Sequence, residues 1–150
     1  MSNMTKRYLD TTVFTYGILY DDEKARKSKE FVKQIAKKIF LGISSTITWD
    51  EVFYTVKKTL GKEIAIEEGK KFLELPNLLL LKLDKDILLK AQELTEKYSI
   101  DPRDAIHAAT AIIHNAIEIV SDDSDFDKIK EIKRIPLEKC TDIWEEDEKR

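Results

Sequence analysis

Apolar residues recur along this chain at two different spacings. In five segments they return every three or four residues, which predicts amphipathic helices. These segments span residues 23–40, 49–60, 62–75, 85–98 and 102–114. Short apolar runs stand before and between the helical segments, and they predict strands. The runs lie near residues 8–9, 41–44, 78–83, 117–120 and 134–137.

Strands that alternate with helices favour βα units around a sheet that is covered on both faces. We therefore predict an α/β fold, a three-layer α/β/α sandwich with a central, mostly parallel sheet of four to five strands. The 150 residues suit one domain of common size, which we expect to span residues 1–140. Residues 141–150 are mostly charged and are expected to form a C-terminal tail.

Composition limits the chemistry and the setting. The net charge is −3, from 26 basic and 29 acidic residues, so the bulk charge does not indicate a general nucleic-acid binder. The single cysteine, Cys140, has no partner for an internal disulfide, and no apolar run is long enough to span a bilayer. Because the N-terminus also lacks an apolar leader, we expect a cytoplasmic protein.

Acidic residues stand at the ends of predicted strands and at the starts of predicted helices. Asp10 follows one strand, Asp123 and Asp125 follow another, and Glu51 and Asp104 lie at helix starts. Ligands of open parallel sheets gather beyond the carboxyl ends of the strands. We therefore expect these carboxylates to converge on one point above the sheet.

Local structure alone could explain several of these acids. Thr48 and Glu51 have the spacing of a capping box, and residues 101–104 have the pattern of an N-cap followed by a helix start. A turn would explain residues 122–125. Asp10 is harder to explain in this way, because no adjacent basic residue follows it and a half-buried carboxylate without a partner is costly.

Taken together, the acids have a chemical explanation that helix capping does not supply. Carboxylates without nearby cysteine and with few histidines are the donor set of a hard cation such as Mg²⁺ or Mn²⁺. Such an ion commonly binds a few carboxylates together with waters and a substrate phosphate. The pattern therefore indicates a divalent-metal site that acts on phosphodiester bonds.

Four sequence motifs resemble those of the PIN domain family. Residues 10–14 (DTTVF) resemble the first motif and residues 49–52 (WDEV) the second. Residues 104–111 (DAIHAATA) closely resemble the third, and residues 120–126 (VSDDSDF) resemble the fourth. Order and spacing match as well, from about residue 6 to residue 137. The length resembles that of the VapC-like toxins of toxin–antitoxin pairs.

This resemblance implies a PIN-like fold and a metal-dependent endoribonuclease that hydrolyses RNA with Mg²⁺ or Mn²⁺. By position, the four catalytic acids of the family fall on Asp10, Glu51, Asp104 and Asp125, and Asp123 joins them as a metal ligand. As a hypothesis, Asp10 and Asp104 bind the main ion directly, while the other acids act through waters or help a second ion. The family also implies a cognate antitoxin protein and a homodimer.

Neighbouring residues receive roles from the resemblance or from their positions. Thr12 and Ser121 match hydroxyl positions that would orient the carboxylates or a bound water. Arg103 adjoins the third acid and is the leading candidate for substrate binding, although a surface arginine at a helix start has the same pattern. His107 has apolar neighbours and is expected to lie in the core rather than to act in catalysis. Asp122 receives no role.

Two other functions stay open on the sequence alone. A Mg²⁺-dependent phosphatase of haloacid-dehalogenase type also places an aspartate at a strand end. That family expects Asp-x-Asp, however, and Thr12 stands at the second position here. A nonenzymatic interaction module, such as a signalling receiver domain, would hold an ion with the same acids, although a receiver carries an acidic pair near its start that this chain lacks.

Overall fold

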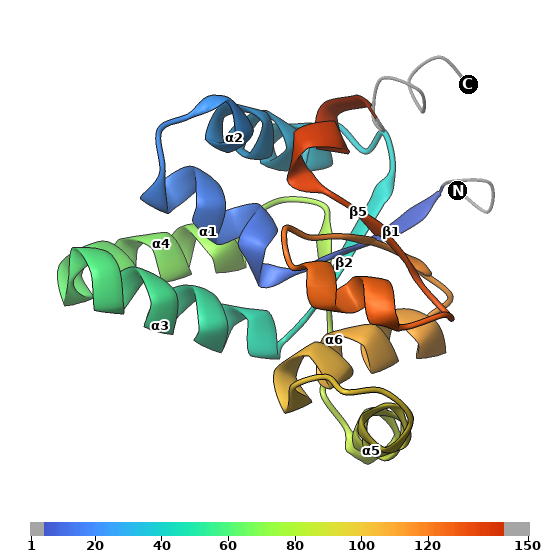
Figure 1. Cartoon of the computed structure of the whole chain (residues 1–150). Coiled ribbons are helices and arrows are strands. Elements are labelled where there is room, and N and C mark those ends of the chain that lie inside the picture. The colour runs from blue at the N-terminus through green and yellow to red at the C-terminus, as the bar shows by residue number, and fades with distance from the viewer. Residues whose placement is uncertain (1–4, 143–150) are drawn as a thin grey trace.

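The two apolar spacings of the sequence correspond to strands and helices in the computed structural model, which describes residues 5–142 (Figure 1). The strands are β1 (Lys6–Leu9), β2 (Leu41–Ser45), β3 (Leu78–Leu81), β4 (Glu118–Val120) and β5 (Lys133–Ile135). The α-helices are α1 (Thr11–Leu19), α2 (Glu23–Ile35), α3 (Ile47–Leu60), α4 (Lys62–Glu74), α5 (Lys85–Lys97) and α6 (Pro102–Ile113). Two short 3-10 helices follow, η1 (Ser124–Lys128) and η2 (Leu137–Lys139).

The strands form one sheet in the order β3-β2-β1-β4-β5, and every pairing is parallel. The chain builds outward from β1 to β3 and then returns to add β4 on the other side of β1. All carboxyl ends therefore lie at one edge, and the order of the strands reverses between β1 and β4. The backbone nitrogen of Asp10 donates to the carbonyl of Val120 at 3.1 Å, which brings the ends of these two strands together.

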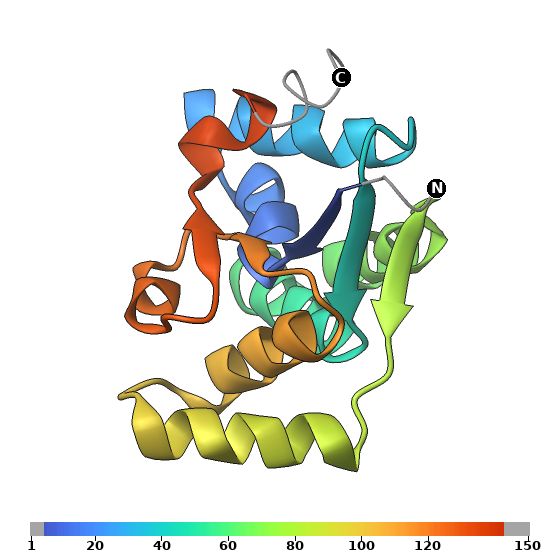
Figure 2. The ribbon, with the colours of Figure 1, turned by 90° about the vertical axis from the view of Figure 1, so that its right-hand side faces the viewer.

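Helices cover both faces of the sheet (Figures 1 and 2). An apolar layer on each face holds them against the sheet. Successive strand residues point to opposite faces, so Leu9 packs with α1–α4 while Tyr8 packs with α5 and α6. Ala105, Ala108 and Ala109 are fully buried on α6, and their small side chains let that helix approach the sheet closely. These layers confirm the predicted α/β/α sandwich.

One predicted helix is shorter than expected. The apolar period runs to Phe40, but α2 ends at Ile35, and Lys38 takes a left-handed conformation with φ of 57°. Phe40 still stacks on Phe31, with 5.0 Å between ring centroids, so the helical spacing continues through a turn that leads the chain into β2. Asn77 donates to the carbonyl of Ala36 at 2.6 Å and fixes this turn.

Most of the predicted charged tail, residues 143–150, lies outside the described residues. Within residues 5–142, no helix is both long and apolar enough to cross a membrane.

Candidate active site

Asp10 stands at the carboxyl end of β1, and the residue is only 5% exposed. Its Oδ2 accepts a hydrogen bond from Ser121 Oγ at 2.7 Å and another from Thr12 Oγ1 at 3.1 Å. Ser121 follows β4, the neighbour of β1, and Thr12 lies in the first turn of α1. Both hydroxyl groups expected near the acids thus hold one carboxylate at the centre of the sheet edge.

Asp104 and Asp123 lie close to Asp10. Asp104 lies in the first turn of α6 and shares a side-chain hydrogen bond with Asp123. Burial, followed by the charges of Asp123 and Asp10, raises the pKa of Asp104 to about 7. Ser121 links Asp10 to Asp123, because its Oγ donates to Asp10 and also accepts from the backbone nitrogen of Asp123 at 2.9 Å. Burial and the repulsion among these acids therefore let Asp104 retain a proton near neutral pH.

Glu51 reaches the same region from α3, and its role is not that of a capping box. Helix α3 begins with Thr46 as its N-cap, and Thr48 pairs instead with Ser44 at 2.8 Å. The capping interpretation is therefore wrong, because strand β2 leads into the helix two residues earlier than that interpretation requires. Glu51 Oε1 accepts from Thr11 Oγ1 at 2.8 Å and contacts His107.

His107 is the site residue that the sequence interpretation left out. It is 1% exposed, as expected of a core residue, but its Nε2 lies 2.5 Å from Glu51 Oε1 and 3.6 Å from Asp10 Oδ1. Burial would lower the pKa of His107, yet the hydrogen bond with Glu51 and the charge of Asp10 raise it. Its position three residues after Asp104 was the available signal, since such residues share one face of a helix.

The same contact shifts the pKa of Glu51 in the opposite direction. Burial would raise the pKa of Glu51, but the hydrogen bond from His107 and its positive charge hold it below its usual value. The two shifts agree with an ionised carboxylate beside a protonated imidazole.

Asp125 lies toward the outside of the acidic cluster. Its carboxylate forms an ion pair with Lys128 at 3.1 Å, and single carboxylate oxygens of Asp101, Asp104 and Asp125 lie within 4.8 Å of one another. Asp101 was interpreted as a capping residue, but its side chain makes no capping hydrogen bond. The cluster therefore includes an exposed acid that the sequence interpretation assigned to capping.

Arg103 and Asp122 lie near the acids and have different surroundings. Arg103 is exposed at the start of α6, and its charge contributes to the lowered pKa of Glu51. Asp122 pairs with Lys24 of α2 at 3.1 Å, and Lys24 also lies over the ring of Tyr16. Asp122 thus joins the loop after β4 to α2, which is a structural role.

The donors fit a hard divalent cation. Asp10, Asp104 and Asp123 supply only oxygen atoms, and their mutual repulsion is the charge pattern that a cation relieves. Glu51 and Asp125 flank these three donors, and fixed hydroxyl groups orient Asp10. No cysteine lies in the described part of the site, in keeping with an oxygen-only donor set.

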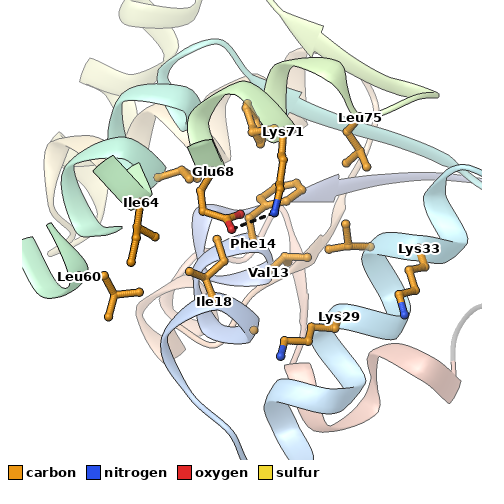
Figure 3. Close-up of a pocket in the computed structure, with 14 residues that line it drawn as sticks. Val13, Phe14, Ile18, Lys29, Lys33, Leu60, Ile64, Glu68, Lys71 and Leu75 are labelled. Atoms are coloured by element: carbon orange, nitrogen blue, oxygen red, sulfur yellow. Dashed lines mark hydrogen bonds and ion pairs between the residues drawn. The ribbon is translucent and has the colours of Figure 1, made fainter. Parts of the chain in front are cut away.

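A groove of about 590 Å³ lies between α1, α2, α3 and α4 (Figure 3). Its wall is mostly apolar and includes Phe14, Val52, Ile64 and Phe72. The rim is charged: Lys29 and Lys33 come from α2, and Lys71 forms an ion pair with Glu68 at 3.5 Å on α4. Val13 and Val52 of its wall are close in sequence to Asp10 and Glu51, but none of the clustered acids lines the groove.

Comparisons with known proteins agree with the fold and the motifs. The PIN domain family matches residues 7–132, whereas no curated protein matches the sequence. VapBC2 from Rickettsia felis, bound to a promoter DNA fragment, is 21% identical, with 88% of this chain and 98% of that chain covered and a TM-score of 0.69. DNA-bound VapBC from Salmonella typhimurium is 21% identical, with 89% and 99% covered and a TM-score of 0.67.

VapC20 from Mycobacterium tuberculosis, a sarcin–ricin loop cleaving toxin, is 14% identical, with 80% of this chain and 92% of that chain covered and a TM-score of 0.65. At these identities the three structures show a shared fold. The family match extends over most of the chain and includes all of the acids that the structure brings together. This chain therefore belongs to the PIN domain family.

Proposed function

We propose that this protein is a divalent-metal-dependent endoribonuclease, the toxin of a toxin–antitoxin pair, and that it hydrolyses RNA phosphodiester bonds. The observation that carries the proposal is the convergence of Asp10, Asp104 and Asp123: burial, together with the charges of Asp123 and Asp10, raises the pKa of Asp104 to about 7. Membership in the PIN family supports nuclease chemistry. The fold shared with a toxin that cleaves the sarcin–ricin loop supports RNA as the substrate.

In this proposal each side chain has a distinct task. Asp10 and Asp104 hold Mg²⁺ or Mn²⁺, while Glu51, Asp123 and Asp125 act through waters or help a second ion. A bound divalent cation lowers the pKa of water and stabilises negative charge on the phosphate. Thr12 and Ser121 fix the orientation of Asp10, with the hydrogen bonds described above.

Arg103 completes the proposed site as a substrate-binding residue. Its exposed position at the start of α6 places it next to Asp104, so a guanidinium there is suited to contact a phosphate of the RNA backbone.

The proposal is tested by replacing Asp10, the most deeply buried of the acids assigned to the metal. We expect Asp10→Asn to abolish RNA cleavage in Mn²⁺ or Mg²⁺, because it removes the charge that binds the ion. Asp21→Asn, at an exposed acid between α1 and α2, is the matched control and is expected to cleave normally. Cleavage is measured on total RNA with each metal and with EDTA.

The alternatives give other results in the same assay. Cleavage by Asp10→Asn at the normal rate contradicts the site assignment. Metal-dependent hydrolysis of a phosphate monoester without RNA cleavage favours the haloacid-dehalogenase type. Metal binding without either activity favours a nonenzymatic module.

We also propose that the groove of Figure 3 binds an amphipathic segment of a cognate antitoxin. Two observations support this occupant: the wall is apolar and the rim carries lysines. Solved VapBC complexes share the fold of this chain, which supports a partner of this class.

A further inference from the structure

His107 connects the middle of the sheet to the acidic cluster. It lies on α6, one turn after Asp104, and its ring is buried between Tyr8 of β1 and Glu51 of α3. Its Nδ1 is 2.5 Å from the hydroxyl of Tyr8, and its Nε2 is 2.5 Å from Glu51 Oε1. Both ring nitrogens therefore have a partner, and three separate elements meet at one side chain.

The direction of these hydrogen bonds follows from their partners. A carboxylate only accepts, so Nε2 carries a hydrogen and donates it to Glu51. Tyr8 is fully buried, and burial together with the charge of Asp10 raises the pKa of its hydroxyl, which keeps its proton. Because a hydroxyl both donates and accepts, Tyr8 suits Nδ1 whether the imidazole is neutral or charged.

The contact determines which oxygen of Glu51 is available. Thr11 and His107 both bind Oε1, and no described residue is hydrogen-bonded to Oε2. The side chain of Glu51 is only 15% exposed, so its rotamer depends on these two donors more than on water. Oε2 is thus the oxygen left for a cation or for the water around it.

Core packing alone does not explain a histidine at this position. Its neighbours Ala105, Ala108 and Ala109 on α6 are apolar and fully buried, which is the environment that an aliphatic side chain would suit. An aliphatic residue would remove the hydrogen bonds that His107 makes with Glu51 and with the hydroxyl of Tyr8, and the loss of buried hydrogen bonds is destabilising.

We propose that His107 is a positioning residue that holds Glu51 in the orientation used for metal binding, with Tyr8 fixing the imidazole from behind. This inference rests on the proposed function, because it assigns Glu51 to the metal site. His107 also lies 3.6 Å from Asp10 Oδ1, so it sets the spacing between two of the acids. It does not touch the ion or the RNA.

The test compares His107→Leu, His107→Gln and Tyr8→Phe with Glu51→Gln and with the double variant His107→Leu/Glu51→Gln. Leucine keeps most of the side-chain volume but removes the donor, whereas glutamine keeps an N–H group near the position of Nε2. His114→Leu, one residue past the end of the same helix, is the matched control. The readouts are the dissociation constant for Mn²⁺, kcat and KM for RNA cleavage, and the melting temperature.

We expect His107→Leu to weaken Mn²⁺ binding by roughly 10- to 100-fold, the usual effect of losing a partner of a metal-binding side chain. Glu51→Gln should weaken binding similarly, and the double variant should be little worse than either single variant, because both changes remove the same carboxylate from the site. His107→Gln should recover most of the affinity, and Tyr8→Phe should lose part of it. KM should change less than kcat.

Other outcomes overturn the inference. Normal Mn²⁺ affinity in a folded His107→Leu protein, with a lower melting temperature only, means that His107 acts in packing. Additive losses in the double variant mean that it acts independently of Glu51. If His107→Leu does not fold, normal affinity in both Tyr8→Phe and Glu51→Gln rejects the proposal. If the variants behave as expected toward Mn²⁺ but the unmodified protein cleaves no RNA, the ribonuclease proposal fails alone.

Discussion

Asp104 retains a proton near neutral pH, and under the proposed function a bound cation would displace this proton. Burial and the neighbouring carboxylates of Asp123 and Asp10 raise its pKa to about 7. Metal binding requires the ionised form, so the ion and the proton compete for this residue. Metal affinity should consequently increase as the pH rises toward 7.

The same shift predicts how Asp104 affects stability in the metal-free protein. The pKa of Asp104 is raised above its unfolded value, so its contribution to the free energy of unfolding is fully present below pH 3.8 and is lost as the pH rises through 7. In Asp104→Asn the side chain carries no charge at any pH, so this loss of stability does not occur. We expect the variant to melt at a higher temperature than the unmodified protein in EDTA, with a difference that is smallest near pH 4 and largest above pH 7.

Thermal unfolding in EDTA from pH 4 to pH 8 measures this difference. Asp86→Asn is the matched control, because Asp86 is an exposed acid in the first turn of α5. Excess Mg²⁺ should reverse the order, since it stabilises only a protein that binds it. An equal shift at all pH values would contradict the proposed repulsion among the acids.

Residues of the site differ in how far the sequence could predict them. Asp10 and Asp104 follow a strand end and a helix start, which are local signals. His107 could not be separated from core packing, because its partners Tyr8 and Glu51 are 99 and 56 positions away. Asp101 was missed because its position before α6 has a local explanation, an N-cap, so nothing in the sequence indicated that it lies near the other acids.

Among the elements, α3 and α4 are joined by a single residue, Gly61. Its φ is 96° and its ψ is 166°, a conformation that is open mainly to glycine. A Cβ atom there would meet no other atom within 4 Å, so substitution changes the backbone energy rather than the packing. A substitution at Gly61 therefore tests the backbone conformation separately from side-chain packing.

We expect Gly61→Ala to lower the free energy of unfolding by about 1–3 kcal/mol, the usual cost of such a strained conformation. Urea denaturation measures the change, with Lys62→Ala at the next, exposed helical position as the control. Because Leu60 and Ile64 of these helices line the groove, the variant should also bind the proposed antitoxin less tightly. Unchanged stability would show that the junction relaxes freely.

The groove itself gives a prediction for the pair α3 and α4. Leu60 of α3 and Ile64 of α4 line the groove and are 40% and 39% exposed. Ile66, also on α4, is 51% exposed but does not line the groove. We expect Leu60→Glu and Ile64→Glu to prevent co-purification with the proposed antitoxin, because a charge would replace apolar contact in the groove. RNA cleavage should persist.

Ile66→Glu serves as the control for that experiment and should retain the complex. If Ile66→Glu and Ile64→Glu lose the partner equally, the effect comes from helix destabilisation. If all three variants retain it, the antitoxin binds another surface.

Element boundaries were predicted best where the signal is local. Asp84 caps α5 through Ile87, and Gly61 ends α3, both at the positions that their residue types indicate. The end of α2 was missed because Phe40 continues the apolar spacing although Lys38 turns the backbone. Phe40 packs on Phe31 from the turn after the helix. In the sequence this contact has the same apolar spacing as a contact within a longer helix.

At the scale of the whole molecule, alternating strands and helices predicted the layers but not the order of the strands. Apolar runs at residues 41–44 and 117–120 look equally suited to pair with β1, and in the structure both do. Return of the chain to the far side of β1 is what creates the strand reversal at the site. That arrangement depends on pairing across more than a hundred residues.

Exposed apolar side chains on β3 and α5 support a prediction about assembly. Leu79 of β3 and Leu88 and Leu89 of α5 are 49%, 47% and 57% exposed, and a second copy of the chain would cover such apolar side chains. We propose a homodimer and expect sedimentation to give twice the mass of the chain. Leu89→Lys should shift the equilibrium toward the monomer, and an unmodified protein that sediments as a monomer would contradict the proposal.

The late position of β4 has a consequence for the timing of activity during translation. Asp10 is made early, but its hydroxyl partner Ser121 comes 111 positions later, and Asp123 follows it. A nascent chain that stops before β4 therefore has Asp10, Glu51 and Asp104 but lacks both Ser121 and Asp123. If the protein cuts RNA as proposed, the ribosome must read most of the message before its product can cleave any transcript, including that message.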